Sequence, residues 1–110
     1  MELDIRVEKD NDQIAIFLTG EIDAFTAPKL KEELAKCTVQ SGKIIQVDLE
    51  QVEYMDSTGL GIFIGALKSA KEHDSSLKLV HLQDRVFRLF KITGLDEIMD
   101  IKPVIQGGKQ

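Results

Sequence analysis

Apolar residues change their spacing several times along this chain, and each change marks a new structural element. Leu3, Ile5 and Val7 alternate with polar residues, and so does a second segment from Ile14 to Leu18. The polar cluster from Glu8 to Gln13 separates them without any helical pattern. Alternation with a period of two indicates β-strands, so the first twenty residues predict a β-hairpin, with Gly20 ending its second strand.

After the predicted hairpin, the apolar residues recur at helical spacing. Thr26-Ala27-Pro28 predicts a helix start, because threonine is a good N-cap and proline is tolerated in a first turn. Leu30, Leu34 and Cys37 then fall on one helical stripe, so Cys37 is expected to be a small core residue rather than a reactive thiol. Ser41-Gly42 is expected to break this helix.

The middle of the chain predicts a second strand–helix unit. Residues Ile44 to Leu49 are nearly continuous in apolar character, which is typical of a strand buried on both faces. Helical spacing resumes at Leu60 and is expected to last until about Glu72 or His73. Its apolar positions are Leu60, Phe63, Ile64, Leu67 and Ala70.

The last third predicts one more such unit. A strand is expected around Leu77 to Val80, and Asp84 can cap a third helix that Gly94 ends. Residues 98 to 101 suit a short final strand or turn. With 110 residues, the chain is predicted to be one α/β domain over residues 1–105, a mixed β-sheet with helices packed against it, followed by a flexible tail over 106–110.

Composition excludes several classes of function. A net charge of −5 argues against nucleic acid and against an anionic membrane surface as partners. A single cysteine, an acidic N-terminus without an apolar leader and the lack of a membrane-length apolar run predict a cytoplasmic protein. The two histidines, His73 and His81, have no metal-ligand spacing, so no metal and no cofactor are predicted.

The stretch from Glu53 to Gly65 carries the chemistry, because Asp56, Ser57 and Thr58 stand side by side just before a helix. A small nucleotide-binding domain is one alternative, since Gly59, Gly61 and Gly65 are spaced near the helix start. About ten residues separate Leu49 from Gly59, however, whereas a dinucleotide loop begins at the strand end.

Two further alternatives fit less well. A phosphoacceptor receiver domain needs an acidic pair after its first strand, and the hairpin region offers none. A serine hydrolase needs a histidine beside Ser57, but His73 lies 16 residues along the same helix, about 24 Å away. His81 falls on a different strand.

A modification switch at Ser57 is the remaining functional hypothesis. A phosphate at this helix start would face backbone N–H groups and the positive end of the helix dipole, and its charge would stand beside Asp56. The structural alternative is that Ser57 or Thr58 only caps the helix, a contribution of about 1 kcal/mol. The residues alone leave both possibilities open.

The run from Val52 to Gly61 resembles the signature of the anti-anti-sigma factors, also called anti-sigma factor antagonists, of the STAS domain family. The resemblance covers nearly the whole chain. Gly20–Asp23 resembles the turn before the first helix of the family, and Ser76–Leu79 and Arg88–Leu95 resemble the later strand and third helix.

This resemblance implies a binding protein without catalysis of its own, acting in a stress response. Its implied partners are an anti-sigma factor that is also a serine kinase, which inactivates it by phosphorylating Ser57, and a PP2C-type phosphatase that restores it. The unphosphorylated form would bind the anti-sigma factor, so that a sigma factor is released for transcription. ATP and Mg²⁺ belong to the kinase, and a monomer is expected when the chain is free. The expected partner-binding residues are Asp23, Asp56, Ser57, Thr58, Gly59, Leu60, Gly61 and Ile62.

Overall fold

The structure, a computed structural model, describes residues 2–104. Its elements follow the predicted order of strands and helices, with one short 3₁₀ helix, η1, added before the last strand. In chain order they are β1 (Leu3–Lys9), β2 (Gln13–Ile22), α1 (Ala27–Thr38), β3 (Ile44–Met55), α2 (Ser57–Glu72), β4 (Ser76–Leu82), α3 (Asp84–Ile92), η1 (Leu95–Glu97) and β5 (Asp100–Pro103).

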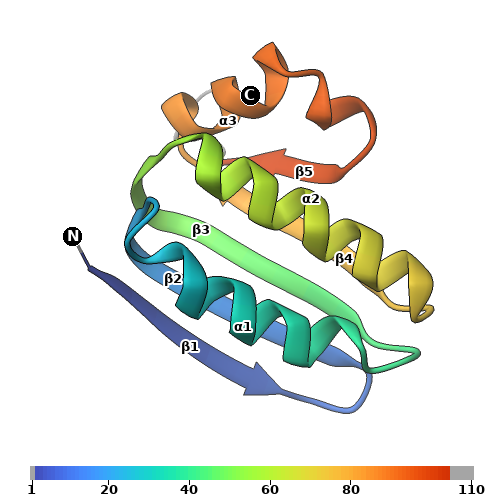
Figure 1. Cartoon of the computed structure of the whole chain (residues 1–110). Coiled ribbons are helices and arrows are strands. Elements are labelled where there is room, and N and C mark those ends of the chain that lie inside the picture. Colours follow the sequence, from blue (N-terminus) through green and yellow to red (C-terminus); the bar gives the residue numbers. More distant parts are fainter. Residues whose placement is uncertain (1, 105–110) are drawn as a thin grey trace.

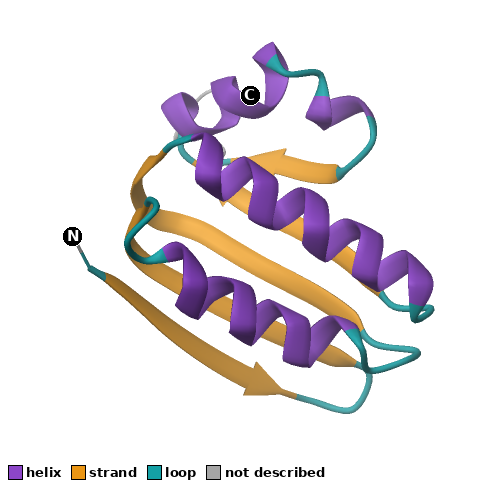
Figure 2. Ribbon diagram, in the orientation of Figure 1, coloured by secondary structure: helices purple, strands orange, loops and turns teal. Residues whose placement is uncertain are grey.

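The five strands form one mixed sheet in the order β1-β2-β3-β4-β5. The predicted hairpin is confirmed, because β1 and β2 pair antiparallel, while every later pair is parallel. Parallel neighbours need a crossover, and each helix supplies one. Figures 1 and 2 show α1 and α2 side by side across one face of the sheet, with α3 beyond α2 near β5.

The core lies between this face and the helices. Alternate residues of the central strands point into it and are fully buried, among them Ile16, Leu18, Val47 and Leu49. Phe63 of α2 and Phe90 of α3 also meet there, with ring centroids 6.3 Å apart. The stripe of α1 is buried as predicted: Leu30, Leu34 and Cys37.

The opposite face of the sheet carries polar side chains, and this overturns one prediction. Residues 44–49 were expected to be buried on both faces, but Ile44 is exposed and Gln46 and Asp48 are only half-buried. On the same face, Arg6 lies over the ring of Phe17, 4.4 Å from its centroid. Helices cover one side only, so β3 alternates between core and solvent.

Two strands run further than predicted. β2 passes through Gly20 and ends at Ile22, and β3 ends at Met55 instead of near Leu49. Gly20 adopts a φ of +125°, and a Cβ there would stand 2.3 Å from the carbonyl oxygen of Glu2. Glycine is therefore required at Gly20 for a close approach of the first residues, not for a strand end.

The helices begin and end near the predicted residues, but the predicted capping hydrogen bonds are not made by those residues. Thr26 is the N-cap residue of α1, yet its hydroxyl makes no capping bond. Gln83 precedes α3, so Asp84 is its first residue rather than its cap. Gly94, with a φ of +78°, follows the end of α3 as predicted. α1 ends at Thr38, before the predicted break at Ser41-Gly42.

Two further predictions concern the C-terminal tail and membrane-spanning segments. The predicted flexible tail, residues 106–110, lies outside the described residues. Among residues 2–104, none of the helices combines the length and the apolar character that crossing a bilayer demands.

Candidate functional site

The site forms where two parallel strands end together. Ile22 of β2 pairs with Met55 of β3, the last residues of their strands. The backbone N–H of Asp56 donates to the carbonyl oxygen of Ile22 across 3.3 Å, which ties the two following loops together. Asp23 and Asp56 therefore lie in adjacent loops, as the predicted docking surface requires.

Asp56 is the residue that caps α2. Its backbone is extended, and its Oδ1 accepts a hydrogen bond from the backbone N–H of Thr58 at 2.9 Å. Its carbonyl oxygen accepts a second from the N–H of Gly59 at 3.0 Å. The sequence alternative in which Ser57 or Thr58 caps the helix is therefore wrong, because β3 extends far enough to place the aspartate at the N-cap position.

Ser57 is the first residue of α2, and both Ser57 and Thr58 are exposed. The following residues divide between core and surface: Gly59 and Leu60 are buried, Gly61 is exposed and Ile62 is half-buried. The predicted binding segment from Asp56 to Ile62 is thus partly buried and partly exposed. Its exposed part is the first turn of the helix and the side that carries Gly61.

The helix start offers fewer free N–H groups than the sequence suggested. Two of its donors, the N–H groups of Thr58 and Gly59, are already bonded to Asp56. The positive end of the dipole of this 16-residue helix remains beside Ser57. A phosphate on Ser57 would thus meet the helix dipole and the Asp56 carboxylate, not those two donors.

Asp23 stabilises the loop between β2 and α1 through hydrogen bonds to its backbone. Its Oδ1 accepts hydrogen bonds from the N–H groups of Phe25 and Thr26, at 2.9 and 3.0 Å. The Thr26 hydroxyl accepts from the N–H of Asp23 and donates to the carbonyl oxygen of Glu21. This turn leaves Phe25 81% exposed beside the site. Phe25 was not among the predicted site residues, because no periodic pattern distinguishes an aromatic residue in a loop.

A groove of about 720 Å³ runs between α1 and α2 and begins beside Thr58. It is open because small residues face each other across it, including Ala27 and Ala35 on one helix and Gly61 and Gly65 on the other. Ile62 also lines it. Sequence reasoning did not find this groove, since it depends on how two helices pack.

The three glycines of α2 are not arranged around a phosphate. A Cβ on Gly59 would stand 2.4 Å from Cγ of Met55, so this glycine faces the interior, while Gly61 and Gly65 have open space at that position. The predicted gap of about ten residues between the strand and Gly59 is wrong, because β3 ends at Met55, close to Gly59. The glycine placement argues against that loop instead.

The histidines stand apart from Ser57. His73 follows the far end of α2, where its Nδ1 lies 2.8 Å from the carbonyl oxygen of Ser69. His81 is on β4 with its Nδ1 2.9 Å from Oδ2 of Asp48. Neither imidazole is placed to activate the Ser57 hydroxyl as a nucleophile.

The sequence matches the STAS domain family over residues 4–107. It is 53% identical over 105 residues to a Listeria monocytogenes protein named anti-sigma-B factor antagonist, covering 94% of this chain and 92% of that one. A Bacillus subtilis protein of the same name is 43% identical over the full length of both chains. Among solved structures, an anti-sigma factor antagonist from Mycobacterium paratuberculosis superposes with a TM-score of 0.84 at 25% identity, covering 94% of this chain and 88% of that one.

Proposed function

The chain belongs to the STAS domain family, among its anti-sigma factor antagonists, and we propose that it binds an anti-sigma factor under the control of phosphate on Ser57. In its unphosphorylated form it occupies the anti-sigma factor, so that a sigma factor is released. The observation that carries this proposal is the exposed Ser57 at the first position of α2, beside the capping carboxylate of Asp56.

The binding surface is the end of the sheet where β2 and β3 stop. It comprises the first turn of α2 from Asp56, the exposed Gly61 and half-buried Ile62, the Asp23 turn and the exposed ring of Phe25. Exposed aromatic side chains are frequent anchors in protein interfaces. The carboxylate oxygens of Asp23 and Asp56 accept hydrogen bonds from the backbone of their own loops. The two residues therefore contribute to partner binding by holding these loops in the conformation that the partner meets.

Phosphate acts here as added charge on a preformed surface. Phosphoserine carries about −1.5 to −2 charges at pH 7, and it would stand next to the Asp56 carboxylate. Because Asp56 already takes the N–H groups of Thr58 and Gly59, the fold does not need to rearrange around the phosphate. A partner that packs closely on this turn would have to desolvate both anions, which opposes binding.

The kinase is the anti-sigma factor itself, using ATP and Mg²⁺, and a PP2C-type phosphatase removes the phosphate. The chain contributes the acceptor hydroxyl and performs no catalysis. The test is to incubate the purified chain with the cognate anti-sigma factor and ATP, and to map the phosphate by mass spectrometry. We expect it on Ser57, and on neither Thr58 nor another hydroxyl.

Binding measurements on three variants complete the test. Ser57→Ala is expected to stay bound to the anti-sigma factor when ATP is present, whereas Ser57→Asp is expected to weaken binding. Thr58→Ala is the matched control and is expected to behave as the wild type in both respects. Phosphate on Thr58 alone, or on no residue, would contradict the site assignment. Tight binding of ATP by the isolated chain would favour a nucleotide-binding domain instead.

A further inference from the structure

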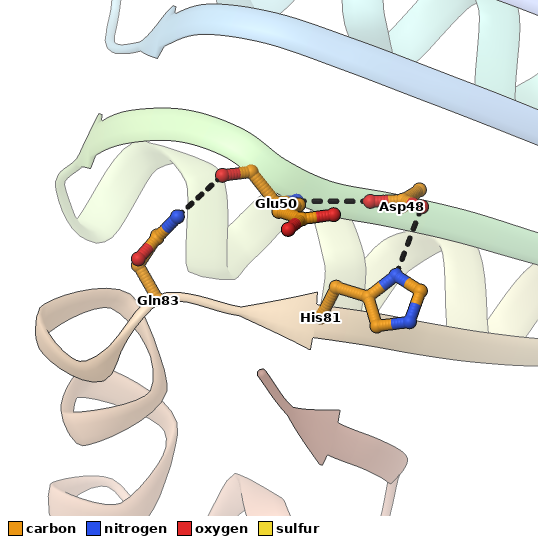
Figure 3. Close-up of polar contacts among 4 residues, drawn as sticks. All are labelled: Asp48, Glu50, His81 and Gln83. Atoms are coloured by element: carbon orange, nitrogen blue, oxygen red, sulfur yellow. Dashed lines mark hydrogen bonds and ion pairs between the residues drawn. The ribbon is translucent and has the colours of Figure 1, made fainter. Parts of the chain in front are cut away.

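Three potential metal ligands gather on the helix-free face of the sheet, on its two central parallel strands. Asp48 and Glu50 come from β3 and His81 from β4, and one ligand atom from each lies within 4.8 Å of the others. Figure 3 shows the three side chains directed toward one another. Ser57 is the first residue of α2, which lies on the other face of the sheet (Figure 1), so the cluster is separate from the proposed switch.

Irregular backbone brings the histidine to this face. In a regular strand His81 would point to the same side as Leu79, which is fully buried in the core. Instead His81 adopts a φ of +60°, and the register between β4 and β5 shifts between Val80 and Leu82. A bulge of this kind redirects a side chain, and here it turns the imidazole toward Asp48.

Neighbouring hydrogen bonds fix the carboxylate of Asp48 and the backbone of Glu50. Asp48 Oδ1 accepts from the backbone N–H of Glu50 at 2.9 Å, which leaves Oδ2 directed at His81. Gln83 Nε2 donates to the carbonyl oxygen of Glu50 at 2.5 Å and ties the residue after β4 to the middle of β3 (Figure 3). Such outer contacts orient metal ligands before an ion arrives.

The spacing suits a transition-metal ion. His81 Nδ1 and Asp48 Oδ2 are 2.9 Å apart. Two ligands that bind zinc tetrahedrally at about 2.0–2.2 Å lie roughly 3.3–3.6 Å from each other, so this pair has to open by about half an ångström to admit the ion. Imidazole nitrogen with carboxylate oxygens is a donor set of the borderline metals, whereas calcium and magnesium prefer oxygen alone.

We propose that Asp48, Glu50 and His81 bind one divalent transition-metal ion of the zinc class. The ion takes the place of the hydrogen bond between His81 Nδ1 and Asp48 Oδ2. Neutral imidazole then carries its proton on Nε2 and presents the Nδ1 lone pair to the metal. Because the His81 side chain is half exposed, water completes the coordination shell.

The test is a calorimetric titration of the full chain with Zn²⁺, after treatment with a chelator. We expect one saturable site per chain. Asp48→Asn, Glu50→Gln and His81→Asn each remove a direct ligand, so each is expected to weaken Zn²⁺ binding by at least the roughly 10- to 100-fold that loss of an outer-shell contact causes. Asparagine is chosen at position 81 because it tolerates a positive φ better than most residues.

His73→Ala is the matched control, because His73 is the other histidine of the chain and lies at the end of α2. It is expected to bind Zn²⁺ as the wild type does. A second measurement is thermal unfolding: at a Zn²⁺ concentration that just saturates the wild type, Zn²⁺ should raise the Tm of the wild type and of His73→Ala, and raise that of His81→Asn much less. No saturable binding, or equal loss in His73→Ala and His81→Asn, would overturn the proposal. No anti-sigma factor is involved, so the result is independent of the switch at Ser57.

Discussion

Asp56 has two effects that substitutions can separate. Its carboxylate accepts the N–H of Thr58 and thereby caps α2, and its charge lies beside Ser57. Asparagine retains the capping oxygen and removes the charge, whereas alanine removes both. The contribution of Asp56 to the stability of the fold and its electrostatic effect on the proposed switch can therefore be examined apart.

We expect Asp56→Ala to lower the free energy of unfolding by about 1 kcal/mol, because an N–H at the start of α2 loses its partner. Asp56→Asn is expected to cost only a few tenths of that, since asparagine is as good an N-cap as aspartate. Urea unfolding followed by circular dichroism measures both values. Equal losses in the two variants would show that charge, rather than capping, is what Asp56 contributes.

At this scale the sequence predicted that Asp56, Ser57 and Thr58 stand at a helix start, but not which of them caps the helix. Asp56, Ser57 and Thr58 can each cap a helix, and only the end of β3 decides which one does. That end was hidden because residues 50–54 are mostly polar, and a strand with one face in solvent shows weaker apolar character near its end. The resemblance to a known family supplied Ser57; the residues alone left capping and modification open.

Helix α2 uses its glycines in two different ways. Gly59 faces the interior, against Met55 and Ile22, whereas Gly61 and Gly65 face the groove beside α1. The same residue type therefore has opposite consequences when it is replaced, although the positions are only two residues apart.

We expect Gly59→Ala to be destabilising by roughly 1–3 kcal/mol, because its Cβ would stand 2.4 Å from Cγ of the buried Met55. Gly61→Ala is the matched control: nothing lies within 4 Å of its Cβ, and alanine favours helix by up to about 1 kcal/mol. Thermal unfolding should therefore move in opposite directions for the two variants. A stable Gly59→Ala would mean that Met55 repacks freely.

Strands and helices were predictable where apolar residues recur at a regular period. Contacts that depend on irregular backbone were not predictable. Alternation predicted the hairpin of β1 and β2, and the helical stripe predicted the buried side of α1. The approach of His81 to Asp48 was not predictable, because it depends on a positive φ at a non-glycine residue and on a register shift. No spacing in the sequence encodes that contact.

The whole molecule is one sheet with its helices on a single side, so the core is a single layer between them. Cys37 of α1 belongs to that layer and is 3% exposed. Burial raises the pKa of the Cys37 thiol, with Lys9 and Lys36 opposing the shift and Glu33 adding to it. The thiol is therefore a probe of opening of the entire domain.

We expect Cys37 to react slowly with a thiol reagent in the native state and rapidly in urea. Because its pKa is higher in the folded state, the unfolded chain ionises first as pH rises past about 8.5, and the free energy of unfolding should fall there. Cys37→Ala should lack that component of the pH dependence. Fast native labelling, at a rate independent of urea, would contradict this placement of the thiol.

Every strand in this sheet pairs with the one made just before it. β2 docks on β1, β3 on β2, β4 on β3 and β5 on β4, and no strand is inserted between two earlier ones. A chain leaving the ribosome can therefore complete the sheet in order of synthesis, since each emerging strand finds its edge already present. Only the pairing of β1 with β2 is local, whereas the parallel partners lie about 21 to 33 residues apart, so each of those pairings has to wait for its crossover helix to be made.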